Sequence, residues 1–353
     1  MPAGIDRRTL LAAMAASTPA QSGVRIGLIT EATGDHLPYY VRAGQAKGVS
    51  EFAIADPSGN SKAPGAIAFA SAAEMLERFR PKLAVITVEP HRAPAAVELA
   101  LRAGIHVVVE KPGCTKLEQF ESLAKLAETR GLQLMLAMAT RLHPAALKAK
   151  ELIAAGYIGK PYGVDMHWIA DQTRIRNPEY RASWVAKRDK VGGGKLVFHG
   201  IHYLDLIQSL VSDRIARVSA FCRNVGGQPI EVEDAAVMSM VFAGGMVGTL
   251  NTGYYLDKGY ANLIHLWGER GWLRFDPRAE NSLEWYSTHP DAPKGVQKFR
   301  TGPVDVYAAM LQAAADFARG AAPPFMTTAE SLSVLRVIFR GYRSAETGMA
   351  QDV

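Results

Sequence analysis

A short apolar run that ends in two charges and a proline constrains the fold of this chain most. The β-branched run Ile105–Val109 is typical of a strand buried on both faces. Glu110, Lys111 and Pro112 follow it directly. In an open parallel sheet the carboxyl ends of the strands face the ligand crevice. We therefore expect Glu110 and Lys111 to lie where a cofactor or substrate binds, on a backbone that Pro112 stiffens.

Short apolar strands and helices alternate from residue 24 to residue 140. Strands are predicted at Val24–Ile29, Phe52–Ala55, Leu83–Val88, Ile105–Val109 and Gln133–Ala137, and helices at Leu37–Lys47, Ala72–Phe79, Pro94–Ala103 and Lys116–Thr129. Repeated strand–helix units of this length imply right-handed crossovers. Residues 24–140 therefore predict an α/β, Rossmann-like dinucleotide-binding domain with a doubly wound parallel sheet.

The pattern changes after a helix predicted at Pro144–Ala155, because the later strands alternate between apolar and polar residues. These strands are predicted at Tyr162–Ile169, Ala216–Cys222, Ala235–Phe242, Gly245–Thr252, Asn262–Trp267 and Gly271–Phe275. Residues 141–353 therefore predict an α+β domain with a mainly antiparallel open sheet. Of the final helices, at Tyr307–Ala318 and Ala329–Ser344, the last is expected to return to the N-terminal domain.

Bulk properties narrow the class of protein. A chain of 353 residues is long for one compact domain and predicts two. The net charge of +6 suits an anionic ligand such as a pyrophosphate, but no basic block interleaved with aromatic residues indicates nucleic acid. No apolar run approaches the roughly 20 residues that span a bilayer. Cys114 and Cys222 lie far apart and are predicted to be free thiols, and no metal site is predicted.

Residues 1–23 differ from the rest of the chain. Arg7 and Arg8 precede the small apolar run Ala12–Ala16, and small residues follow at Ser17–Ala20. A paired arginine, a short apolar segment and a small-residue boundary resemble a twin-arginine export signal. This pattern predicts an exported, periplasmic protein. The alternative is a disordered basic tail on a cytoplasmic protein.

A second motif follows the Glu-Lys-Pro strand end by about eighty residues. It consists of Gly192-Gly193-Gly194 and then Gly200-Ile201-His202-Tyr203-Leu204-Asp205. In this order the two motifs resemble the Gfo/Idh/MocA family, whose members are two-domain, nicotinamide-dependent oxidoreductases that act mostly on sugars and polyols. The resemblance covers roughly Val24 to Gly348. It implies a small sugar-like substrate, and a homo-dimer or homo-tetramer paired through the second-domain sheet.

The turn after the first strand departs from the dinucleotide fingerprint. Thr30 and Ala32 stand in the places of the first two glycines, and Gly34 lies near the third. The Ala32 methyl group and the Glu31 charge both oppose a bound phosphate. The turn can still bind the pyrophosphate of NAD or NADP through backbone N–H groups, aided by the hydroxyls of Thr30 and Thr33.

Other residues at strand ends are expected to contact the cofactor. Asp56 ends the second strand, where a carboxylate accepts hydrogen bonds from ribose hydroxyls and repels a 2′-phosphate, which favours NAD over NADP. The alternative for Asp56 is an Asx-type turn cap. Glu89 and His91 follow the third strand, and the resemblance places them, with Glu110, beside the nicotinamide. His91 can equally cap the next helix.

Lys111 and His202 are the predicted catalytic residues. An ammonium held by Glu110 can donate to a substrate hydroxyl and stabilise the alkoxide as hydride leaves. A neutral imidazole at His202 can remove the proton from the same hydroxyl. Asp205 lies close to one helical turn further on and is expected to orient that ring or contact substrate. The alternative for His202 is a structural histidine on an apolar helix.

Further candidates concern the substrate. Many members of the family carry an aspartate four residues before the histidine, where this chain has Phe198, so His199 beside it is expected to take a polar role. The loop Asp171–Lys190 is rich in arginine and aromatic residues that recognise anions and sugar faces. Arg181 and Trp184 from this loop and His167, before Trp168, are predicted to bind substrate. The loop can equally be a solvated segment of mixed charge.

These residues predict an NAD(P)-dependent oxidoreductase that transfers hydride to or from the hydroxyl-bearing carbon of a sugar, polyol or related compound. Two alternatives stay open. One is a glycosidase or lyase of the same fold in which a retained NAD transiently oxidises a ring carbon. The other is a non-catalytic ligand-binding Rossmann protein, which the altered glycine turn and Phe198 favour.

Overall fold

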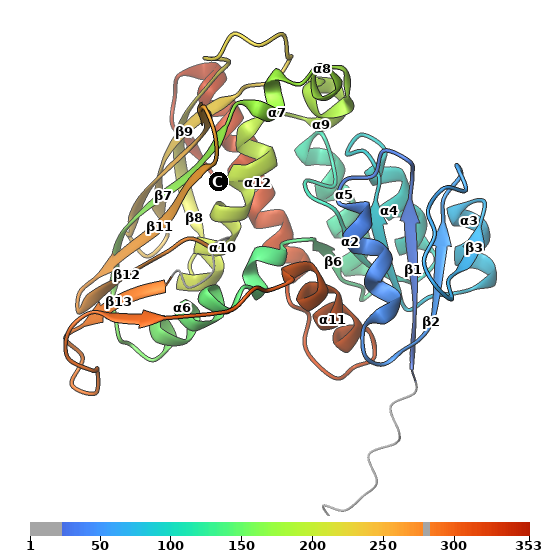
Figure 1. Ribbon diagram of the computed structural model, residues 1–353, viewed down its shortest axis with the longest axis horizontal. Helices are drawn as coiled ribbons and strands as arrows, with labels where there is room; N and C mark the ends of the chain where they lie inside the picture. The colour runs from blue at the N-terminus through green and yellow to red at the C-terminus, as the bar shows by residue number, and fades with distance from the viewer. Residues whose placement is uncertain (1–22, 278–282) are drawn as a thin grey trace, which may run out of the picture.

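The computed structural model describes residues 23–277 and 283–353, which build two sheets with helices between them (Figure 1). The predicted export segment 1–23 lies, except for Gly23, outside the described residues. The predicted fold class is confirmed: one sheet is parallel and Rossmann-like, and the other is mainly antiparallel.

The first sheet has six strands in the order β3-β2-β1-β4-β5-β6, all parallel. Their bounds are β1 Val24–Thr30, β2 Val49–Ala55, β3 Ile67–Phe69, β4 Leu83–Thr87, β5 His106–Val109 and β6 Leu134–Leu136. The strand order reverses between β1 and β4, which is the topological switch point where ligands bind in such sheets. The predicted strands are present here, and β3 is an addition at the edge.

Helices cover both faces of this sheet. The helices α3 (Ala72–Arg78), α4 (Ala93–Arg102) and α5 (Leu117–Thr129) pack on one face. The opposite face packs against α2 (Leu37–Tyr40), the 3-10 turn η1 (Val41–Gln45) and α11 (Val306–Ala318). A helix from near the end of the chain therefore completes the core of the first domain.

The second sheet has nine strands in the order β14-β13-β12-β11-β7-β10-β9-β8-β15. Their bounds are β7 Pro161–Asp171, β8 Ile215–Arg223, β9 Ala235–Phe242, β10 Val247–Leu256, β11 Tyr260–Gly268, β12 Gly271–Phe275, β13 Leu283–Ser287, β14 Gln297–Phe299 and β15 Gln351–Asp352. β7 and β10 run parallel, and the other pairs among the described strands are antiparallel. The strands β13, β14 and β15 were not predicted.

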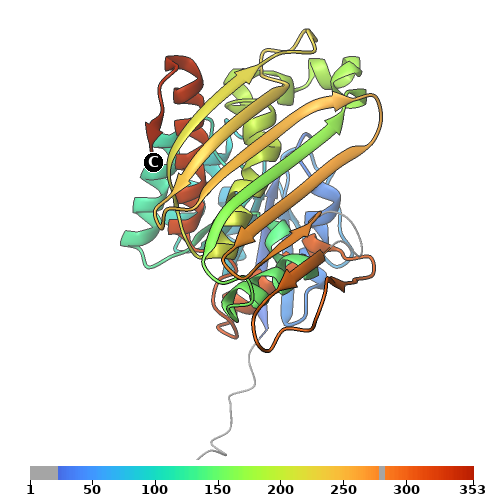
Figure 2. The same cartoon turned by 90° about the vertical axis from the view of Figure 1, so that its left-hand side faces the viewer.

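One face of the second sheet packs on helices and the other does not (Figure 2). The helices on the covered side include α6 (Pro144–Ala154), α10 (Ile201–Val211) and α12 (Thr328–Thr347). The start of α12 lies against the first sheet, because Leu134 N–H donates to Thr328 Oγ1 and Leu136 N–H donates to Ser331 Oγ. This contact caps the β6 edge and joins the two domains.

One predicted helix is shorter than expected. In place of a helix at Leu37–Lys47 the structure has α2 and η1, because Pro38 supplies no backbone donor and Gly44 weakens a helix interior. Cys114 and Cys222 are free thiols, and burial raises the pKa of each to about 12. Within the described part of the chain, no helix is long and apolar enough to cross a membrane.

Candidate active site

A cavity of about 730 Å³ lies between the two sheets and takes its walls from three parts of the chain. The first domain contributes residues at the ends of its strands, the second contributes β7 and the start of α10, and the segment before α11 closes a side. Residues that line it include His36, Lys111, His143, Trp168, Arg174, Phe198, His199, His202, Asp305 and Tyr307. The two residues predicted to be catalytic, Lys111 and His202, therefore face one cavity from different domains.

Lys111 is the second residue after the end of β5, and its side chain is 1% exposed. Its Nζ lies 3.4 Å from Asp35 Oδ2 and 3.7 Å from Glu110 Oε1. On another side, Nζ lies 3.6 Å from the centroid of the Phe198 ring. The ring of Phe198, the residue noted above in place of an aspartate, therefore holds the ammonium by a cation–π contact.

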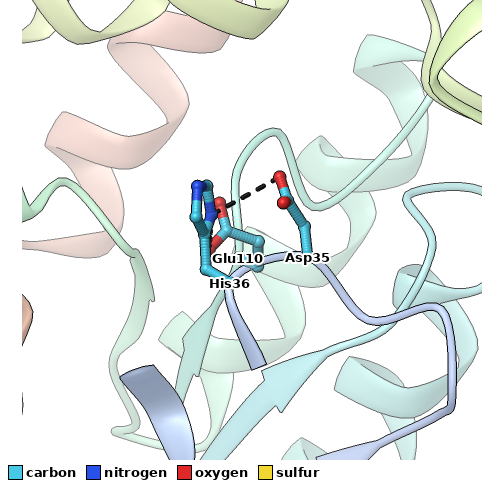
Figure 3. Close-up of side chains that lie close together, drawn as sticks. All are labelled: Asp35, His36 and Glu110. Carbon is cyan, nitrogen blue, oxygen red and sulfur yellow. Dashed lines mark hydrogen bonds and ion pairs between the residues drawn. The ribbon is translucent and has the colours of Figure 1, made fainter. Parts of the chain in front are cut away.

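Asp35, His36 and Glu110 form a compact cluster (Figure 3), and the two carboxylates of this cluster also contact the Lys111 ammonium. His36 Nδ1 lies 3.4 Å from Asp35 Oδ2 and 3.2 Å from Glu110 Oε2, and Tyr40 donates a hydrogen bond to Glu110. Burial opposes ionisation of Asp35, but Lys111 and His36 lower its pKa below the ordinary value. These atoms are close enough to share a cation. Because the Lys111 ammonium already supplies the positive charge, we assign the cluster to holding Lys111 rather than a metal.

The glycine run explains how His199 and His202 reach the cavity. Gly192 has a φ of 84°, and a side chain at Gly194 would place its Cβ 2.0 Å from the Glu233 carbonyl oxygen. This close approach lets the buried Glu233 carboxylate accept hydrogen bonds from the N–H groups of Gly194 and Leu196. A π-helical turn, η4 (Leu196–Gly200), then leads into α10 and presents both histidines.

His199 is buried against aromatic rings at the back of the cavity. Its ring centroid lies 5.0 Å from Trp168, and no hydrogen-bond partner of its Nδ1 is present among residues 23–277 and 283–353. Burial lowers the pKa of His199 well below the ordinary value, and Lys195, Arg174 and Lys111 lower it further. His199 is therefore a neutral ring that can accept or donate a hydrogen bond without carrying charge.

The turn predicted to bind phosphate is already held by protein groups. Thr30 donates to the Thr87 carbonyl oxygen and Thr33 donates to Glu89, so neither hydroxyl takes the predicted role toward a phosphate. Glu31 accepts hydrogen bonds from the Glu89 N–H group and from Arg92. The charge of Glu31 is thus compensated. Within the turn, the Gly34 N–H group donates to the Glu31 carbonyl oxygen.

Asp56 takes the alternative considered for it, an Asx-type turn cap, whereas His91 does not cap α4, whose N-cap residue is Arg92. Both Asp56 carboxylate oxygens accept hydrogen bonds from Ser58 or Ser61. Burial opposes ionisation of Asp56, but these hydrogen bonds lower its pKa to about 2. Its carboxylate is ionised and caps the loop, as an Asx-type turn does. His91 Nδ1 lies 3.4 Å from Glu89 Oε2. The backbone N–H group of His91 donates to the Lys190 carbonyl oxygen, and this hydrogen bond joins the two domains.

Four predicted substrate residues lie away from the cavity wall. Asp205 faces Arg141, to which it is joined by two hydrogen bonds of 2.8 and 2.7 Å, and so does not orient His202. His167 lies on the other face of β7 from Trp168, where its Nε2 is 2.9 Å from Asp165. In the 171–190 loop, Arg181 donates to Gln228 and Trp184 donates to the Thr33 carbonyl oxygen.

Several residues of the cavity wall were not predicted. His36, His143, Tyr307 and Asp305 come from segments far from the two motifs, and the returning α11 brings the last two into place. Arg174 belongs to the predicted loop but was not singled out in it. Its position three residues after the end of the long strand β7 could have indicated that Arg174 lies at the cavity.

The parallel sheet with its switch-point crevice and the lysine–histidine cavity define a two-domain dehydrogenase-type protein. Residues 27–138 match the oxidoreductase family with an NAD-binding Rossmann fold, and residues 146–274 match the GFO/IDH/MocA C-terminal domain. The chain belongs to the Gfo/Idh/MocA oxidoreductase family.

Individual relatives are distant. An uncharacterized oxidoreductase, sll0816, of Synechocystis sp. is 29% identical over 183 residues, which is 49% of each chain. This match and that with an uncharacterized oxidoreductase of Schizosaccharomyces pombe span about half the length of those relatives. The 1,5-anhydro-D-fructose reductase of Ensifer adhaerens is 23% identical over 76% of this chain and 78% of that protein.

The solved structures share the fold. The WlbA dehydrogenase from Bordetella pertussis, in complex with NADH and UDP-GlcNAcA, superposes with a TM-score of 0.80 at 23% identity. The superposition covers 94% of this chain and 98% of that one.

Proposed function

We propose that the protein transfers hydride between NAD(P) and a hydroxyl-bearing carbon of a sugar- or polyol-like substrate. The observation that carries the proposal is that Lys111 and His202, from different domains, line one cavity beside the switch point of the parallel sheet. Relatives whose names give an activity include a sugar-derivative reductase, the 1,5-anhydro-D-fructose reductase of Ensifer adhaerens.

Each cavity residue has a distinct role in this proposal. Lys111 donates a hydrogen bond to the reacting oxygen and stabilises negative charge there, since Asp35 and Glu110 hold its ammonium in place. His202 moves the proton to and from that oxygen. Phe198 cannot carry a proton, and burial keeps His199 neutral, so among the cavity residues of η4 and α10 proton transfer is assigned to His202.

The cofactor, when bound, supplies the hydride acceptor or donor. Backbone groups of the turn around Ala32 and Gly34 would hold its phosphates, and Lys111 and Glu110 would lie at its reactive end. NAD is proposed over NADP because Asp56, although it caps its own loop, keeps a negative charge at the end of β2. A 2′-phosphate placed there would be repelled.

Cofactor release and a matched pair of lysine variants test this function. Purified protein is denatured, and the supernatant is examined for NAD(H) and NADP(H) by absorbance and mass spectrometry. A native sample supplied with cofactor is assayed with a panel of sugars and polyols. Lys111→Met is expected to lower turnover by about 10²–10⁴-fold. Lys125→Met, at an exposed lysine paired with Glu128, is the control and should leave turnover unchanged. Full activity of Lys111→Met would refute the assignment.

We also propose that two copies of the chain pair through the uncovered face of the second sheet. Large apolar side chains are exposed along the strands on this face, including Phe221, Val241, Val247 and Trp267. Contiguous exposed apolar surface of this kind marks an interface. Sedimentation velocity should show a dimer or tetramer, and Phe221→Asp should shift it toward the monomer. A wild-type monomer would contradict the proposal.

Export by the twin-arginine route is proposed from residues 1–23. Cell fractionation should find the protein in the periplasm, and the double substitution Arg7→Lys with Arg8→Lys should retain it in the cytoplasm. Periplasmic protein from the double variant would contradict this route.

A further inference from the structure

The charged residues of the cavity are mostly cationic. Among the described residues that line it, Lys111 and Arg174 carry permanent positive charge, whereas Asp305 is the one carboxylate. Asp305 forms an ion pair with Arg42. Lys111 is balanced by Asp35 and Glu110. The remaining permanent charge of the cavity wall is that of Arg174, which interacts electrostatically with Asp35 and Asp171.

Arg174 lies on α7 (Thr173–Arg176), shortly after the central strand β7, where it is exposed to solvent and lines the cavity beside phenol rings. Tyr254, Tyr180 and Tyr260 are the groups that raise its pKa against the effect of burial. No ion pair of Arg174 occurs in residues 23–277 or 283–353. The nearby Asp171 uses its two oxygens to accept hydrogen bonds from the N–H groups of Thr173 and Gly259.

Arg174 and Lys111 belong to the same space. Both lower the pKa of His199, and Arg174 also contributes to the lowered pKa of Asp35, which contacts Lys111. A single ligand in the cavity can thus reach the proposed reacting site and Arg174 together. A guanidinium offers a planar fork of donors that matches a carboxylate or phosphate, and the aromatic rings beside it suit a sugar face.

We infer that the substrate is an anionic sugar, whose carboxylate or phosphate pairs with Arg174 while a hydroxyl group lies at Lys111. This inference rests on the proposed function for the position of the hydroxyl group. The inference that Arg174 binds an anion depends only on the residues that line the cavity. It makes Arg174 a specificity residue, because a neutral sugar would leave its guanidinium in the cavity without an anionic partner.

The test is binding of matched neutral and anionic sugars to the whole protein, without added nicotinamide. Glucose, galactose and mannose are each titrated by calorimetry as the free sugar, the uronate and the 6-phosphate. We expect an anionic form to bind at least about tenfold more tightly than its neutral parent. The uronate and phosphate arms show which anion is preferred.

Two arginine variants complete the test. Arg174→Gln should abolish the preference for the anionic form, and Arg174→Lys should keep part of it. Arg176→Gln is the control, because Arg176 is an exposed neighbour whose guanidinium faces Asp257. Equal binding of neutral and anionic forms, no binding of any anionic probe, or a preference that survives Arg174→Gln would overturn the inference. Since these titrations need no hydride transfer, their failure is distinct from failure to bind or reduce NAD.

Discussion

Replacement of Asp205 separates a structural role from a catalytic one. Its carboxylate is joined to the Arg141 guanidinium by hydrogen bonds from Nε and Nη2, and the two side chains are 3% and 7% exposed. Glu330 accepts a third hydrogen bond from Arg141 at 2.8 Å. In Asp205→Asn the buried guanidinium keeps Glu330 but loses its bidentate partner.

The expected loss of stability follows from that geometry. Removing one partner of a buried ion pair costs about 3–5 kcal/mol, and the surviving Glu330 contact places Asp205→Asn near the lower end. Because domains have only about 5–15 kcal/mol of stability, the effect should be plain in urea unfolding followed by tryptophan fluorescence. The double variant Asp205→Leu with Arg141→Met removes both charges and should recover most of the loss.

Two controls make the result interpretable. Glu74→Gln breaks an exposed i,i+4 pair with Arg78 and should change the free energy of unfolding by no more than about 0.5 kcal/mol. Turnover of folded Asp205→Asn, and the pH profile of kcat/KM, should match wild type. Unchanged stability together with a displaced pH profile would refute our reasoning and show that Asp205 acts on His202.

Three further predictions concern the walls of the cavity. His199 is neutral when folded but takes up a proton when unfolded below about pH 6.5, so the free energy of unfolding should fall as pH drops from 6.5 to 5. His199→Gln should reduce that slope, by up to about 1.4 kcal/mol per pH unit, and an unchanged slope would count against a buried neutral ring. Phe198→Leu removes the ring face from Lys111, worth about 0.5–2 kcal/mol, and should lower kcat/KM by about 2–30-fold, whereas Phe198→Tyr should not. Gly194→Ala forces a Cβ against the Glu233 backbone and should lower the unfolding free energy by about 1–3 kcal/mol; a wild-type melting temperature would contradict the close packing.

The sequence predicted the sheets well because their signals are local. The apolar strands of the first domain and the alternating strands of the second both appear with nearly the predicted bounds. Lys111 and His202, singled out by the two motifs, both line one cavity, since one lies after a parallel strand and the other follows a glycine turn that only glycine can make. The α2 region differed because a proline and a glycine interrupt it.

The rest of the site depends on side-chain orientation and on contacts between segments that are distant in sequence, and a local sequence pattern predicts neither. Asp205 was expected beside His202, but a guanidinium from Arg141, distant in sequence, takes its carboxylate. His167 and Trp168 are adjacent in a strand, so only one of them can face the cavity, and burial selects Trp168. Tyr307 reaches the site because α11 packs back on the first domain.

The most direct test of the account is the cofactor content of the purified protein together with titration of the emptied protein with NAD(H). We predict NAD(H) released on denaturation or, after its removal, saturable binding of NAD(H) that is tighter than binding of NADP(H). Lys111→Met should keep this binding while losing turnover. Protein that releases no nicotinamide cofactor and binds none on titration would contradict the proposed oxidoreductase function.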